Sequence, residues 1–77
     1  MNINRYGYNI KSMSWEFISS EIEPYILTDL ECAKEELEKL RSYYINTKSY
    51  EVSLIDNNEF EIINYQSRIE YIIRLDI

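Results

Sequence analysis

Seventy-seven residues with a formal net charge of −6 leave room for one small domain, and this chain has no histidine and a single cysteine. An intramolecular disulfide is therefore excluded, and so is a zinc site built from histidine and cysteine. The acidic surplus argues against direct binding to a phosphate backbone. The sequence shows neither a long apolar stretch nor a signal pattern, so it does not predict a membrane or secreted location. We expect a cytoplasmic protein that needs no metal or cofactor.

Residues 1–27 predict a short strand or loop and then a short helix. Tyr6, Tyr8 and Ile10 alternate over residues 3–10, which is typical of an edge strand, although the glycine between the tyrosines weakens it. A serine at position 12 or 14 can cap a helix, whose apolar residues at helical spacing are Trp15, Ile18 and Ile22. Pro24 would end this helix. The alternation of Met13, Trp15 and Phe17 keeps a strand open as the alternative.

The clearest element is a helix over residues 28–46. Its apolar residues recur at intervals of three and four and form one stripe, made of Leu30, Ala33, Leu37, Leu40 and Tyr44. Thr28 and Glu31 are spaced as a capping box at its start. The opposite side is acidic in its first half and carries Asp29, Glu31, Glu35, Glu36 and Glu38. We expect the apolar stripe to pack on a sheet.

Residues 49–76 predict a three-stranded antiparallel meander, because the apolar period changes to two and turn signals occur at residues 56–58 and 66–67. A three-residue first turn, with Asn58 in the left-handed region, would place Leu54 opposite Ile62. One face then forms a core of Val52, Leu54, Phe60, Ile62, Ile69, Tyr71, Ile73 and Leu75. The other face sets three isoleucines, Ile55, Ile63 and Ile72, among charges. We expect the amino-terminal segment or a partner to cover them.

The fold class that follows is α+β, as a single domain. The main helix and the short helix would pack on three antiparallel strands, or on four if residues 3–10 join the sheet.

No motif in the chain specifies a reaction. Without histidine, acid–base catalysis would depend on carboxylates, tyrosine or lysine. Glu31, Glu35 and Glu38 share one helix edge, but an exposed row of carboxylates does not separate their pKa values as a catalytic pair requires. The chain also lacks a glycine-rich phosphate loop and a nucleophile elbow. We therefore expect a protein without enzymatic activity and assign no catalytic residue.

The acidic residues are concentrated in two stretches. Residues 16–38 contain eight acids and one base, and residues 51–61 contain four acids and no base. Such stretches favour a basic protein surface as the partner, and nearby tyrosines can supply contact area at a small entropy cost. The predicted partner-binding residues are Glu31, Glu35, Glu36, Glu38, Tyr43, Glu59, Glu61 and Tyr65.

In its small size, its acidic helix (residues 29–38) and its acidic hairpin (residues 51–61), the chain resembles the small acidic inhibitors of phages and mobile elements, of the anti-CRISPR and DNA-mimic kind. The resemblance implies a non-enzymatic inhibitor that occludes the nucleic-acid site of a bacterial defence protein or blocks its assembly. One alternative is an antitoxin or immunity protein that neutralises a basic toxin. Others are a homodimer or larger oligomer, formed through a strand edge or the three isoleucines, and a protein that sequesters a small cationic or nucleoside ligand.

Overall fold

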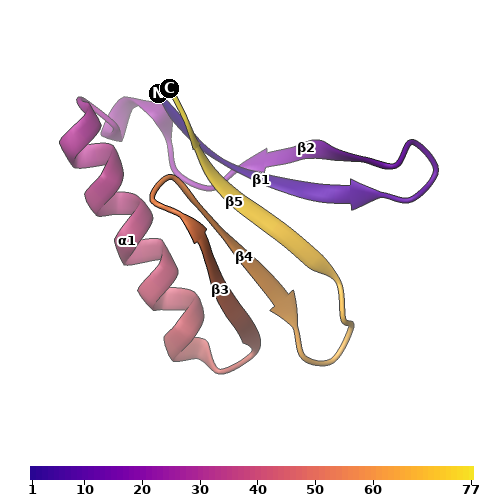
Figure 1. The fold of residues 1–77 in the computed structure, drawn as a ribbon. Helices are drawn as coiled ribbons and strands as arrows, with labels where there is room; N and C mark the ends of the chain where they lie inside the picture. Colours follow the sequence, from indigo (N-terminus) through magenta and orange to yellow (C-terminus); the bar gives the residue numbers. More distant parts are fainter.

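The fold is α+β, with one α-helix packed on one face of a five-stranded antiparallel sheet (Figure 1). The computed structural model describes the backbone of residues 1–77 and every side chain except that of Pro24. In chain order the elements are β1 (Asn2–Asn9), β2 (Ser14–Ser20), the short 3-10 helix η1 (Pro24–Ile26), α1 (Leu30–Thr47), β3 (Tyr50–Asp56), β4 (Glu59–Asn64) and β5 (Glu70–Asp76).

The strand order is β2-β1-β5-β4-β3, so that β5 lies in the middle of the sheet. The amino-terminal hairpin joins the meander through antiparallel pairing of β1 with β5, from Asn2 opposite Asp76 to Gly7 opposite Tyr71. The sheet thus has more strands than the three or four that the sequence predicts. β1 was expected at an edge, but it pairs on both sides.

The predicted short helix is wrong, because residues 14–20 form strand β2. This strand pairs with β1 from Asn4 opposite Ser20 to Asn9 opposite Ser14, with an irregularity at Ile18. Aromatic and β-branched residues favour strands, and the nearby β1 offers a hairpin partner. The helical spacing that suggested a helix includes Ile18, the residue at which the strand's own alternation is broken.

Helix α1 confirms the main predicted helix, but its cap differs from the predicted capping box. Asp29, with an extended backbone, is the N-cap, and its carboxylate accepts a hydrogen bond from the Cys32 amide at 2.8 Å. The helix therefore begins at Leu30, two residues after Thr28. It ends where Lys48 adopts a left-handed conformation with a φ of 59°.

The meander β3-β4-β5 has the predicted faces, but its first pairing is offset by two residues from the prediction. Leu54 lies opposite Phe60 rather than Ile62, because a bulge at Ile55 precedes a two-residue turn. Asp56 stabilises this turn by accepting a hydrogen bond from the Asn58 amide at 2.7 Å. An offset of two leaves each side chain on its predicted face. Leu54 is nevertheless 67% exposed, because it lies on the edge strand.

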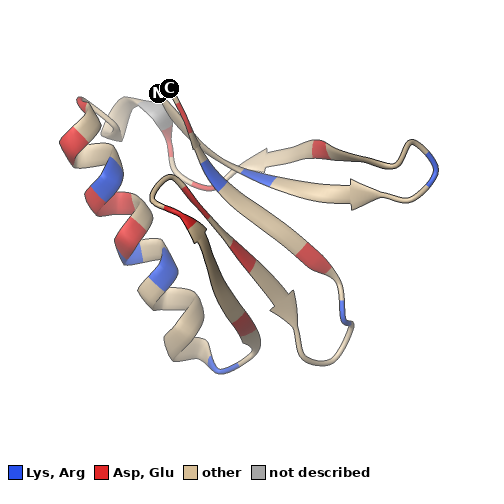
Figure 2. Ribbon diagram, viewed as in Figure 1, with Lys and Arg blue, Asp and Glu red and all other residues tan. Residues whose placement is uncertain are grey.

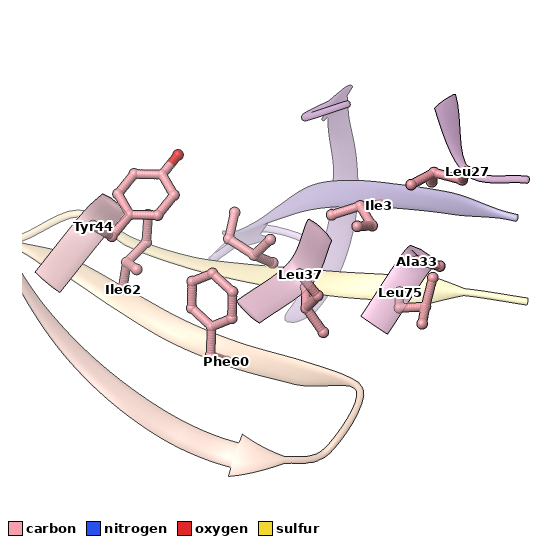
Figure 3. Packing of buried hydrophobic residues seen from close by; sticks show 9 residues of the cluster. Ile3, Leu27, Ala33, Leu37, Tyr44, Phe60, Ile62 and Leu75 are labelled. Atoms are coloured by element: carbon pink, nitrogen blue, oxygen red, sulfur yellow. The ribbon is translucent and has the colours of Figure 1, made fainter. Parts of the chain in front are cut away.

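The core lies between α1 and the sheet (Figure 3). It consists of Ile3, Leu27, Ala33, Leu37, Tyr44, Phe60, Ile62, Ile73 and Leu75. Ile69, which was expected in the core, is half exposed next to the β4–β5 turn. We call the opposite side of the sheet, which α1 does not cover, the open face. The amino-terminal segment extends the sheet as strands instead of covering Ile63 and Ile72 on this face.

Candidate functional site

Helix α1 carries five of the eight residues that the sequence predicts for partner binding, and Figure 2 shows its red segments in the first half of the helix. Glu31, Glu35 and Glu38 line one open groove, together with Lys34, Leu30 and Asn57 of the β3–β4 turn. Tyr43 lies further along, beside Glu35, Glu38 and Lys39. The helix thus does bring Glu31, Glu35, Glu38 and Tyr43 to one side.

Two of the helix carboxylates already form ion pairs with neighbouring cations. Lys39 Nζ lies 3.2 Å from Glu36 Oε1, and Arg41 Nε donates to Glu38 Oε1 at 3.0 Å. The hydrogen bond from Arg41 lowers the pKa of Glu38. A partner would have to compete with these intrahelical pairs. The helix side therefore offers less free negative charge than its sequence suggests.

The open face carries a second acidic group, which we call the sheet carboxylates: Glu51, Glu59, Glu61 and Glu70. Across three strands, Glu51 on β3 and Glu70 on β5 both lie opposite Ile63 on β4. Glu61, two residues before Ile63 on β4, lies on the same face. Among the residues that the structure describes, no ion pair involves any of these four side chains.

The pKa of Glu61 reflects both its burial and the mutual repulsion within this group. Partial burial raises its pKa, and the neighbouring charges of Glu70 and Glu51 raise it further. The one cation on an adjacent strand, Arg74, lies opposite Glu59 but bonds instead to Asp76, with Nε donating to Oδ1 at 2.7 Å. The sheet carboxylates are therefore a concentrated negative charge without internal compensation.

The other half of the open face is aromatic. Tyr6 and Phe17 pack edge to face with ring centroids 6.2 Å apart, and Tyr8 and Trp15 do so at 5.4 Å. These pairs lie across β1 and β2, because Tyr6 is opposite Phe17 and Tyr8 is opposite Trp15. Phe17 is 59% exposed. We call these four residues the aromatic strip.

Asp76 joins the two halves of the open face. It accepts hydrogen bonds from Asn4 Nδ2 at 2.7 Å, from the Tyr6 hydroxyl and from Arg74. The Arg74 guanidinium also lies over the Tyr6 ring, 4.2 Å from its centroid. Burial alone would raise the pKa of Asp76, but the hydrogen bonds from Tyr6, Asn4 and Arg74 outweigh it and hold the pKa below its usual value.

The predicted partner-binding residues do not form one surface. Five lie on α1, on one side of the sheet, whereas Glu59 and Glu61 lie on the open face. Tyr65 follows β4 and lines a depression with Tyr50, Glu51 and Lys48 at the edge of the sheet. Because the sheet lies between the two acidic groups, a single flat partner surface can contact only one of them.

Sequence reasoning did not select six residues of the open face: Glu51, Glu70, Tyr6, Tyr8, Trp15 and Phe17. The two glutamates are among the charges on the outer face of the predicted meander, and pairing of the strands would have marked them as neighbours of Glu61. The aromatic strip could have been found only by reading residues 14–20 as a strand. The alternation of Trp15 and Phe17 was the available signal.

Comparison with known proteins gave no match: no family model, no curated protein and no solved structure matches the chain. Within the part of the chain that the structure describes, no group of three or more acidic, cysteine or histidine side chains is arranged to hold a metal ion. No helix among those residues has the length and apolar character needed to cross a bilayer.

Proposed function

We propose that this protein is a non-enzymatic inhibitor that binds a basic, nucleic-acid-handling protein, with the sheet carboxylates as the centre of its binding surface. The observation that supports this most directly is the crowding of Glu51, Glu61 and Glu70 on an uncovered sheet face, with a raised Glu61 pKa. Carboxylates that repel one another gain more from a cationic partner than carboxylates already paired.

The arrangement suits a partner surface rich in lysine or arginine. Glu51 and Glu70 flank Ile63 on the two neighbouring strands, so their backbones lie about 10 Å apart, twice the interstrand spacing. A cationic side chain placed over Ile63 would contact apolar surface with its stem and reach carboxylates with its head. The negative field of the whole chain would accelerate the encounter at low ionic strength.

Within this proposal, the kind of inhibitor and its target are taken from the resemblance to phage-type inhibitors. The protein would act in the cytoplasm of a bacterial host and block a defence protein in the manner of an anti-CRISPR protein. An immunity protein against a basic toxin would use the same charge complementarity, and the identity of the captured partner separates the two roles.

The test uses three purified baits in a lysate of a bacterium that carries defence systems. One is the wild-type protein. The second is a sheet variant, E51Q/E61Q/E70Q, and the third is a helix variant, E31Q/E35Q/E38Q, which removes the same charge from the other side. We expect a basic nucleic-acid-binding protein to bind the wild-type and helix baits, to elute as salt rises, and to be lost from the sheet bait.

The captured protein is then assayed for nucleic-acid binding or cleavage with each purified bait. Wild-type protein should inhibit it and the sheet variant should not. Equal capture by the sheet variant would contradict the proposed surface. A captured partner whose activity is unchanged in the complex would contradict inhibition.

A further inference from the structure

Strand β2 is an edge of the sheet that nothing in the described structure covers. It pairs with β1 on one side, and on the other side it has no neighbouring strand. All seven of its residues are exposed. Figure 1 shows the β1–β2 hairpin projecting away from α1 and from the rest of the sheet. Its backbone groups on the free side can be satisfied by water or by another extended strand.

The two edges of the sheet differ in how they are protected. Edge strands of monomeric proteins usually carry lysine, proline or inward-pointing charges. At the opposite edge, β3 packs beside α1 and carries Glu51 and Asp56. The sequence of β2, SWEFISS, has a single charge, at Glu16. The bulge at Ile18 is its one irregularity, and it leaves residues 14–17 as a regular stretch.

The charge distribution indicates which partner strand this edge accepts. Residues 1–20 contain two basic residues and one acidic residue, whereas residues 21–77 contain six basic and thirteen acidic residues. Figure 2 shows the hairpin with little charge and the acidic residues on the helix and on the other strands. Two copies of so acidic a chain repel each other on most of their surface. The hairpin is the region where they can meet without this repulsion.

From the free edge, its apolar side chains and this charge distribution, we infer that β2 pairs antiparallel with β2 of a second copy. A two-fold axis perpendicular to the sheet would make one continuous ten-stranded sheet. This symmetry keeps both helices on one side. It joins the two aromatic strips at the centre of the open face and leaves the sheet carboxylates of the two copies at opposite ends.

The inference is independent of the proposed function, because it uses a different strand and a different type of interaction. Its salt dependence is also opposite. Pairing through backbone hydrogen bonds and aromatic side chains is opposed by the net charge of each copy, so added salt should strengthen it. Binding of a basic partner to the sheet carboxylates should instead weaken as salt rises.

Sedimentation of the whole protein tests the inference at protein concentrations up to about 100 µM, above the micromolar Kd of a modest dimer. We expect a concentration-dependent dimer whose Kd falls as salt is added. The F17K variant places two like charges near the axis and should raise the Kd by about tenfold or more. The matched control is L54K, which changes an exposed apolar residue on the opposite edge strand and should leave the dimer intact.

Amide hydrogen exchange provides a second readout on the wild-type protein, free of any effect of substitution on folding. Amides of β2 should become more protected as the protein concentration rises, while those of β3 should not. A monomer at every concentration would overturn the inference, and so would equal effects of F17K and L54K. A monomeric wild-type protein whose β2 becomes protected only with a partner protein would also overturn it.

Discussion

Arg5 on β1 donates a hydrogen bond through Nη2 to the hydroxyl of Tyr44 on α1, at 2.6 Å. The same guanidinium donates through Nε to Glu21 Oε1 at 2.6 Å and lies 4.7 Å from the centre of the Tyr71 ring. Burial would lower the pKa of Arg5, but the hydrogen bond and charge of Glu21 outweigh it and raise the pKa. This cluster fastens the amino-terminal hairpin to the helix at the margin of the core.

Removing the Tyr44 hydroxyl should therefore weaken the link between the hairpin and the helix. Tyr44 is 5% exposed, and its hydroxyl both accepts from Arg5 and donates to Glu21. We expect Y44F to lower the free energy of unfolding by about 1–2 kcal/mol, measured by urea denaturation. Y43F removes an exposed hydroxyl from the preceding residue and should change the free energy of unfolding little. Equal effects of the two substitutions would contradict this role of the cluster.

The structure shows that Asp29, and not Thr28, is the N-cap of α1, and the two residues should therefore differ in their contribution to stability. We expect D29A to cost about 1 kcal/mol of unfolding free energy, because the Cys32 amide loses its acceptor. T28A should lower the free energy of unfolding clearly less, because Thr28 precedes the N-cap residue and lies outside the helix. Thermal or urea unfolding of both variants measures the difference. A larger loss for T28A would indicate that the predicted capping box forms after all.

Asp76 should stabilise the protein only while it is ionised. Its pKa is lowered in the folded state, so the folded protein binds this proton more weakly than the unfolded chain does. Its contribution is present above the unfolded pKa, near 4, and is lost as the pH falls through the folded value. At pH 7 we expect D76N to cost about 1–3 kcal/mol, because Asn4, Tyr6 and Arg74 share this acceptor.

The control for D76N is E23Q, which removes one charge at an exposed position and should have little effect at pH 7. Urea unfolding between pH 7 and pH 3 would measure both variants. The stability difference between wild type and D76N should shrink at the acidic end of this range. A difference that stays constant with pH would contradict an ionised Asp76 as the stabilising group.

Glu61 should show the opposite pH dependence. Its pKa is raised in the folded state by burial and by Glu70 and Glu51, so the folded protein binds this proton more tightly than the unfolded chain. Stability is then lost as the pH rises through the raised pKa, above the usual value of about 4.3. We expect E61Q to stabilise the protein at pH 7 by up to about 0.5 kcal/mol, a small gain because the side chain is largely solvated.

The gain from E61Q should disappear as the pH falls through the raised pKa of Glu61, and it should be smaller in high salt. Unfolding curves at pH 7 and pH 4, each at two salt concentrations, measure both effects. E35Q on the helix is the control for loss of one charge. A stabilisation by E35Q equal to that of E61Q would assign the effect to net charge rather than to crowding on the sheet.

The sequence predicts the α1 helix and the faces of the meander because a core enforces both. Leu37 and Tyr44 can be buried only if the helix presents its stripe to the sheet, and Phe60 and Ile62 must then share the facing side. The exact pairing was not predictable in the same way. A turn one residue shorter than predicted and a bulge at Ile55 together shift the partner of Leu54 by two residues. This shift moves no side chain to the other face, so hydrophobic patterning does not detect it.

Strand β2 was missed for a related reason. Patterning identifies an element by the face that it buries, and every residue of β2 is exposed. Trp15 and Ile18 therefore gave no reliable period. Their strand conformation depends on pairing with β1, which in turn depends on β5, far along the chain. The open face could not be assembled from sequence without that long-range pairing, and the acidic residues were instead grouped by their position along the chain.

The position of β5 also determines when this fold can form. Asn4 and Asp76 are 72 positions apart, and β5 follows every other element in the chain. Until β5 is present, the β1–β2 hairpin has no connection through the sheet to β3 and β4, and an isolated hairpin is only marginally stable in water. The β1–β2 hairpin and the β3–β4 pair can therefore form one sheet only after β5 has paired with both. Folding should be slow for a chain of this size, and the strand edges that β5 later covers stay open to wrong pairing until it arrives.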